Sequence, residues 1–137
     1  MKYLTTVGRI LFALPFGVMG LNHFLMKSYY VGMMSTFIPG SGYTILITGL
    51  ALIAACISII AKKYIQISCL LLALLLFLFI LTIHIPGLLD STEVTILSMH
   101  TKVSTLAFIE LMKDASLMGG ALMIAGIYRN DKVVAKT

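Results

Sequence analysis

Charged side chains are scarce in this chain of 137 residues. Only 11% of the residues are charged, whereas a soluble domain carries about 25%. The basic residues form no run interleaved with aromatic residues, which excludes a nucleic-acid surface, so we expect no nucleic-acid partner. Hydrophobic residues make up 60% of the sequence and the mean hydropathy is +1.06. This composition predicts that a lipid bilayer surrounds most of the chain.

Cysteines are also few, and two of them cannot form a disulfide framework. Cys56 and Cys69 lie six residues before and six residues after the pair Lys62-Lys63. An antiparallel pair of helices joined at these lysines would hold the two thiols at similar depth. Two interpretations stay open: a thiol pair, or two small apolar residues that pack in the core.

Motifs of protein-bound redox centres are absent from the sequence. It contains no C-x-x-C-H for haem attachment, no flavin fingerprint and no set of cysteine ligands for an iron–sulfur cluster. We therefore expect no intrinsic redox centre. A bound quinone or a partner protein would have to supply one if the chain takes part in electron transfer.

Four apolar stretches fill most of the sequence, at about residues 4–25, 43–61, 64–85 and 111–128. Each approaches the roughly 20 residues that a helix needs to cross a bilayer core of about 30 Å. Lipid offers the backbone no hydrogen-bond partners, so each stretch is predicted to be a helix. The predicted fold is all-α: an integral membrane antiparallel four-helix bundle that forms a single domain over residues 1–137.

The basic residues predict how these spans are oriented. With four spans, one side holds Lys2, Lys62, Lys63, Arg129, Lys132 and Lys136, and the other holds Lys27, Lys102 and Lys113. The positive-inside rule then places both termini in the cytoplasm. Pro86-Gly87 is expected to end the third span. The segment 88–108 is polar and lies outside, and its composition does not distinguish a loop, a short strand and an amphipathic helix.

Two helices carry polar residues on a single face. Helical spacing in the first span aligns Arg9, Ala13, Phe16, Gly20, His23 and Lys27, and in the fourth it aligns Glu110, Asp114, Leu117, Ala121, Ile124 and Tyr128. We predict that both stripes face the interior of the bundle. Small residues in the spans allow close helix packing, and they would serve a homo-oligomer equally well.

The topology predicts that ionisable side chains converge at the outer end of the bundle. They are His23, His84, Glu110, Lys113 and Asp114. Each ionisable side chain inside a span costs about 2.5–3.5 kcal/mol on insertion scales, so five of them near one end need an explanation. One is an interfacial polar cap, and the other is a small-molecule binding site. Arg9 lies near the inner end, where we expect it to pack against helix ends or anionic lipid.

The sequence contains metal-ligand residue types but no motif that would arrange them around an ion. Two histidines, Glu110 and Asp114 offer nitrogen and oxygen ligands, but no close motif such as H-E-x-x-H is present. Lys113 beside them would oppose a cation. The sequence therefore predicts no metal.

Several short motifs together resemble the DoxX family. They are Gly8-Arg9, Gly20-Leu21-Asn22-His23-Phe24, Ile38-Pro39, His84-Ile85-Pro86 and the run from Lys113 to Ala121. The resemblance covers nearly the whole chain and implies a four-helix protein of the bacterial inner membrane. It also implies an association with redox systems that handle thiols, thiosulfate or quinones, in which this chain would be at most a subunit of a membrane oxidoreductase.

The leading functional hypothesis is therefore a membrane component of a redox system with a polar small-molecule site, possible quinone binding and a soluble or membrane oxidoreductase partner. A small transporter or permeation subunit is the first alternative, although four spans without an inverted repeat seldom enclose a path. A membrane scaffold that recruits a soluble enzyme is the second.

Overall fold

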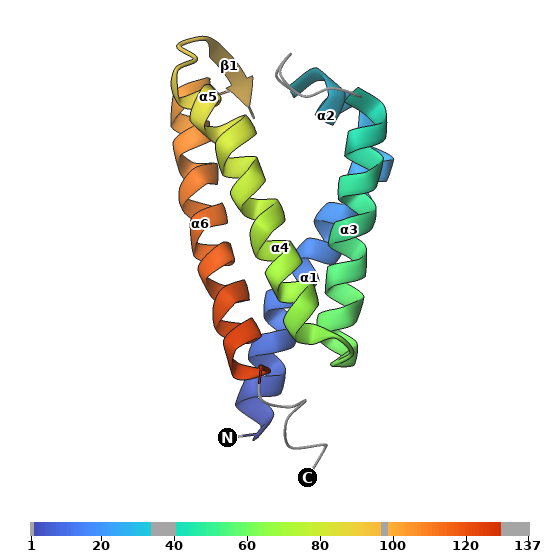
Figure 1. Cartoon of the computed structure of the whole chain (residues 1–137). Coiled ribbons are helices and arrows are strands. Elements are labelled where there is room, and N and C mark those ends of the chain that lie inside the picture. Colours follow the sequence, from blue (N-terminus) through green and yellow to red (C-terminus); the bar gives the residue numbers. More distant parts are fainter. Residues whose placement is uncertain (1, 34–40, 97–98, 130–137) are drawn as a thin grey trace.

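The structure, a computed structural model, describes residues 2–33, 41–96 and 99–129. Four long helical rods dominate it (Figure 1). They are α1 (Lys2–Leu25), α3 (Ser41–Ala61), a third rod made of α4 (Ile65–Phe79), the π-helical turn η1 (Ile80–His84) and α5 (Ile85–Leu88), and α6 (Val103–Ile127). The predicted all-α class with four packed helices is confirmed.

Two small elements connect the rods at one end of the molecule. The short helix α2 (Lys27–Met33) follows α1, and a hairpin of β1 (Glu93–Ile96) and β2 (Met99–Lys102) precedes α6. Figure 1 shows α2 and the hairpin at the end opposite to the start of α1 and the end of α6. Both described ends of the chain therefore lie on the same side of the bundle, as an even number of crossings requires.

The rods pack as two pairs, α1 with α3 and α4 with α6. In the first pair the backbones approach so closely that a Cβ on Gly20 would lie 2.7 Å from the carbonyl oxygen of Gly49. The pairs meet through α3 and α4 and where the ring of Phe12 lies against Gly120. Toward the end that carries α2 and the hairpin, the two pairs diverge (Figure 1).

A short turn joins α3 to α4 and sets this arrangement. Lys62 and Tyr64 take positive φ angles of 57° and 58°, a conformation that is uncommon outside glycine. The hydroxyl of Ser68 donates to that of Ser58 over 2.6 Å, and the Ser58 hydroxyl donates to the carbonyl oxygen of Lys63. These hydrogen bonds tie the two helices together beside the turn and support the predicted antiparallel hairpin.

The interior of the bundle is apolar and its outer surface is apolar as well. One buried cluster draws on all four rods and includes Phe16, Leu52, Ile59, Leu72 and Ala121. Many large apolar side chains are nevertheless exposed, among them Leu11, Ile47, Leu71, Leu74 and Met123. Exposed apolar surface of this extent is typical of a membrane-facing protein.

Three helices are long and apolar enough to cross a membrane. They are Tyr3–Leu25, Gly42–Ala61 and Ile65–Leu88, close to the first three predicted spans. The fourth rod, α6, is 25 residues long but carries Glu110, Lys113 and Asp114 on successive turns. Its crossing of the bilayer stays a prediction.

The end of the third rod is close to the predicted one, whereas the start of the fourth differs. Pro86-Gly87 lies in the last turn of the third rod, which ends at Leu88. Within the segment 88–108 the structure describes the end of α5, the strands β1 and β2 and the first six residues of α6, so the fourth helix begins at Val103 rather than near residue 111. In the hairpin Glu93 pairs with Lys102 and Val94 pairs with Thr101. The β-branched residues Val94, Thr95 and Ile96 suit strand β1.

Candidate functional site

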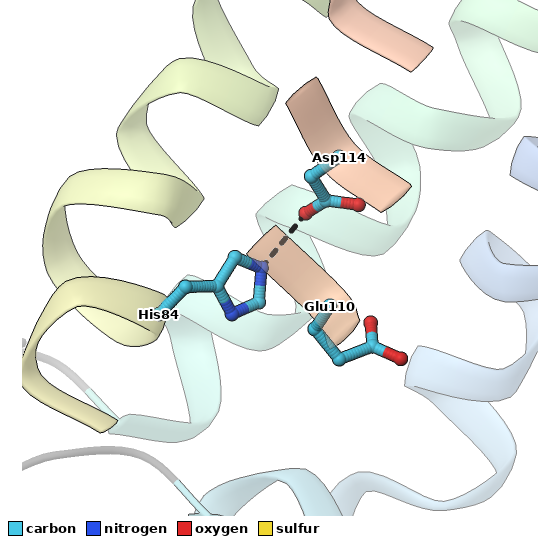
Figure 2. Close-up of side chains that lie close together, drawn as sticks. All are labelled: His84, Glu110 and Asp114. Atoms are coloured by element: carbon cyan, nitrogen blue, oxygen red, sulfur yellow. Dashed lines mark hydrogen bonds and ion pairs between the residues drawn. The ribbon is translucent and has the colours of Figure 1, made fainter. Parts of the chain in front are cut away.

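The position of His84 follows from a local disturbance of the third rod. Pro86 has no N–H to donate, and its ring crowds the carbonyl group four residues earlier. The backbone directly before it widens into the π-helical turn η1, a feature that is frequent at functional sites. The widened turn ends at His84 and directs its imidazole toward α6 (Figure 2).

The imidazole of His84 forms a hydrogen bond with Asp114 in the interior of the bundle. His84 Nε2 and Asp114 Oδ2 lie 2.9 Å apart, and the side chains are only 10% and 6% exposed. Figure 2 shows this hydrogen bond as a dashed line between the third rod and α6. This buried pair joins the third rod to α6 through two residues that are 30 positions apart in the sequence.

Lys113 and Glu110 extend the pair toward the surface. Lys113 forms an ion pair with Glu110, and its Nζ lies 3.7 Å from Asp114 Oδ1. The side chains of Lys113 and Glu110 are 37% and 47% exposed, so the cluster runs from a buried end at His84 to an accessible end at Glu110. We call these four residues the outer polar cluster.

The outer polar cluster contains two acidic side chains and one lysine. In their usual ionised forms the two carboxylates carry two negative charges and Lys113 carries one positive charge. One negative charge of the cluster therefore has no lysine or arginine partner within it, and uncompensated charge is costly at membrane depth.

His23 occupies a different environment. Its Nδ1–H donates to the carbonyl oxygen of Met19 over 2.7 Å, and its ring stacks on Tyr30 with centroids 4.3 Å apart. Within the described ranges, the ligand atoms that lie within 4.8 Å of one another come from His84, Glu110 and Asp114, and His23 is not among them. The structure thus brings together four of the five candidates, and a ligand-binding role for His23 stays a prediction.

Tyr30 is the residue that sequence reasoning missed beside His23. The two are seven residues apart, which corresponds to two helical turns. Helical hydrogen bonds continue from α1 into α2, since Met26 N–H donates to Asn22 and Tyr30 N–H donates to Met26. This spacing could have placed both rings on one face.

Arg9 lies near the opposite end of the bundle, where it contacts the end of α3. Its Nη1 donates to the carbonyl oxygens of Ile59 and Ile60 over 2.8 and 3.1 Å. The last carbonyl groups of a helix have no partner within the helix, and the partial negative charge there favours a cation. Arg9 is only 6% exposed and therefore acts as an internal cap of α3.

Cys56 and Cys69 are free thiols that are buried in the same core cluster. Cys56 packs against α1, where a Cβ on Gly17 would lie 2.8 Å from its sulfur atom. A small polarisable side chain suits this contact. Whether the two thiols also act as a redox pair stays a prediction.

These features define a multi-pass helical membrane protein with a buried polar cluster near one end of the bundle. The chain matches no known family model, no curated protein and no solved structure.

Proposed function

We propose that this protein is the membrane component of a redox system and that its outer polar cluster binds a small molecule such as a quinone head group. The observation that carries the proposal is the buried hydrogen bond of 2.9 Å between His84 and Asp114. A histidine held by a carboxylate is suited to donate or accept a proton. Full reduction of a quinone takes two protons as well as two electrons, and this pair is placed to supply one of these protons.

Each residue of the cluster has a role in this proposal. His84 exchanges the proton with a carbonyl or hydroxyl oxygen of the ligand, and Asp114 orients the imidazole and stabilises its protonated form. Lys113 stabilises an anionic form of the ligand. Glu110 holds Lys113 in place at the accessible end of the cluster.

Electrons must come from elsewhere, because the sequence carries no redox-centre motif. We propose that a soluble or membrane oxidoreductase partner delivers them, as the resemblance to the DoxX family implies. The same resemblance and the distribution of lysine and arginine support insertion into a bacterial inner membrane with both termini in the cytoplasm. The outer polar cluster then lies near the periplasmic face.

Bound quinone tests this proposal directly. The protein is extracted from its native membrane in polymer-bounded lipid discs, and co-purified quinone is measured by mass spectrometry per mole of protein. We expect quinone in the wild-type protein and a loss of at least tenfold in Asp114→Asn and His84→Phe.

Glu93→Gln is the matched control, because Glu93 is an exposed carboxylate on the hairpin at the same end. It should retain quinone at the wild-type level. Wild-type protein with no more quinone than Asp114→Asn would overturn the quinone assignment.

A further inference from the structure

Three side chains of the outer polar cluster together have the composition of a metal site. Among the described residues, one ligand atom each of His84, Glu110 and Asp114 lies within 4.8 Å of the other two. We infer that these residues form a binding site for a divalent transition-metal cation, in which Lys113 competes with the metal for the carboxylates. The inference does not depend on the redox function proposed above.

The geometry requires only a small adjustment. Zinc binds histidine nitrogen and carboxylate oxygen at about 2.0–2.2 Å in a tetrahedron, which places ligand atoms roughly 3.4 Å apart. The separations here lie on both sides of this value, since the three ligand atoms lie within 4.8 Å of one another and those of His84 and Asp114 lie 2.9 Å apart. Glu110 is half exposed, and its carboxylate can rotate toward the other two ligands, which are already 2.9 Å apart. Three protein ligands leave a fourth position open to water or a substrate.

The ligand types narrow the choice of metal. One imidazole and two carboxylates form a set of nitrogen and oxygen donors, which suits Zn²⁺ and related first-row cations. The histidine comes from η1 and both carboxylates come from α6 (Figure 2), so a bound metal would fasten the third rod to the fourth. No short sequence motif indicates the site, because its ligands come from two separate helices.

Lys113 competes with a metal ion for the two carboxylates. Its ammonium group contacts Glu110 and lies 3.7 Å from Asp114 Oδ1, so it supplies positive charge to the same two carboxylates that would bind the metal. A divalent cation at these carboxylates would have to replace this ammonium, because two positive groups cannot share the same small site. The long side chain of Lys113 can then extend to the lipid headgroups.

This competition predicts opposite effects for residues that are neighbours in one cluster. Removal of a ligand should weaken metal binding, whereas removal of Lys113 should strengthen it. A cluster with a purely structural role would show no such reversal. The sequence predicts no metal because Lys113 opposes a cation. The strength of this opposition can be measured as the change in metal affinity when Lys113 is replaced.

The experiment uses detergent-purified, quinone-free, full-length protein and Zn²⁺ as the probe. Isothermal titration calorimetry measures the dissociation constant, and Co²⁺ reports the coordination through its visible absorption. We expect Zn²⁺ to bind the wild-type protein with a stoichiometry of one and Lys113→Met to bind at least tenfold more tightly. Glu110→Gln and His84→Phe should each bind at least tenfold more weakly and lose the Co²⁺ bands.

His100→Ala is the control, since His100 lies on the exposed hairpin, where it contacts Thr95. It should bind Zn²⁺ as the wild-type protein does. Glu110→Gln changes a half-exposed side chain and keeps its shape, so its result does not depend on whether the His84 variant folds. Binding that Lys113→Met weakens, or that Glu110→Gln and His84→Phe leave unchanged, would overturn the inference. Because no quinone is present, either result leaves the quinone assignment untouched.

Discussion

Arg9 donates a hydrogen bond to the carbonyl oxygen of Ile59 over 2.8 Å, across 50 residues of sequence. The contact joins the beginning of one apolar helix to the end of another. It satisfies a carbonyl group that the helix itself leaves without a partner, and it holds the guanidinium where the helix dipole favours positive charge.

Replacement of Arg9 should therefore destabilise the pairing of α1 with α3. We expect Arg9→Met to lower the free energy of unfolding by about 1–3 kcal/mol, because hydrogen bonds to a charged group are lost and buried carbonyl groups lose their donor. Thermal unfolding in detergent measures the change. Arg129→Met is the control, since Arg129 is exposed, and it should unfold like the wild-type protein. Equal losses in the two variants would contradict a capping role.

The His84–Asp114 pair should show strong energetic coupling. Removal of one partner from a buried pair leaves the other unsatisfied and costs about 3–5 kcal/mol. We expect the double variant His84→Phe/Asp114→Leu to lose less than the sum of the single losses, with a coupling energy of about 0.5–3 kcal/mol. A double-mutant cycle of unfolding measures it. The same cycle between His84→Phe and Ser116→Ala, an exposed position on α6, should give no coupling.

The contact between Gly20 and Gly49 should tolerate no additional methyl group. In Gly20→Ala the new Cβ would lie 2.7 Å from the carbonyl oxygen of Gly49, which is rigid backbone. Overpacking of this kind costs about 1–3 kcal/mol, so the melting temperature should fall. Gly119→Ala is the matched control, because a Cβ there meets nothing within 4 Å. If both variants melt alike, the close approach of α1 and α3 is wrong.

The carboxyl group of Asp90, which precedes the hairpin in the sequence, should titrate at a lower pH than an ordinary aspartate. The backbone N–H of Thr92 donates to Asp90 Oδ1 over 2.9 Å, and hydrogen bonds from Thr92, the backbone one first, lower the pKa of this exposed carboxyl group. Because the folded pKa lies below the unfolded one, the stabilisation is complete above the unfolded pKa and is lost as the pH falls through the folded pKa. The amide resonance of Thr92 should titrate with a midpoint below the ordinary aspartate value. In Asp90→Asn this titration should disappear.

Much of the fold could be predicted from hydrophobicity and helical spacing. The first three spans match the three apolar helices closely, and all residues of the first predicted stripe except Lys27 are buried. Lipid leaves the backbone no alternative to helix over such lengths, so sequence determines structure there almost alone. The hairpin could not be predicted, because its strands are short and their composition suits several structures.

The sequence predicts how far along the bundle axis the candidate residues lie, but not which of their helices are neighbours. Helix length and topology indicated that His23 and His84 both lie toward the outer end. The pairing of α1 with α3 and of α4 with α6 separates them, and it depends on the close contact of Gly20 with Gly49. Glycines of this kind occur in several spans, so the sequence does not state which of them meet.

The π-helical turn at Ile80–His84 has an evolutionary consequence. A π-helical turn bonds residue i to residue i+5 and so holds one residue more than an α-helical turn, which means that the loss of one codon here would restore an ordinary helix and change which side chains of this turn face α6. Conversely, one inserted codon in an ordinary helix would suffice to bring a histidine inward. The polar chemistry of this otherwise oily bundle could therefore arise, or vanish, in a single genetic step.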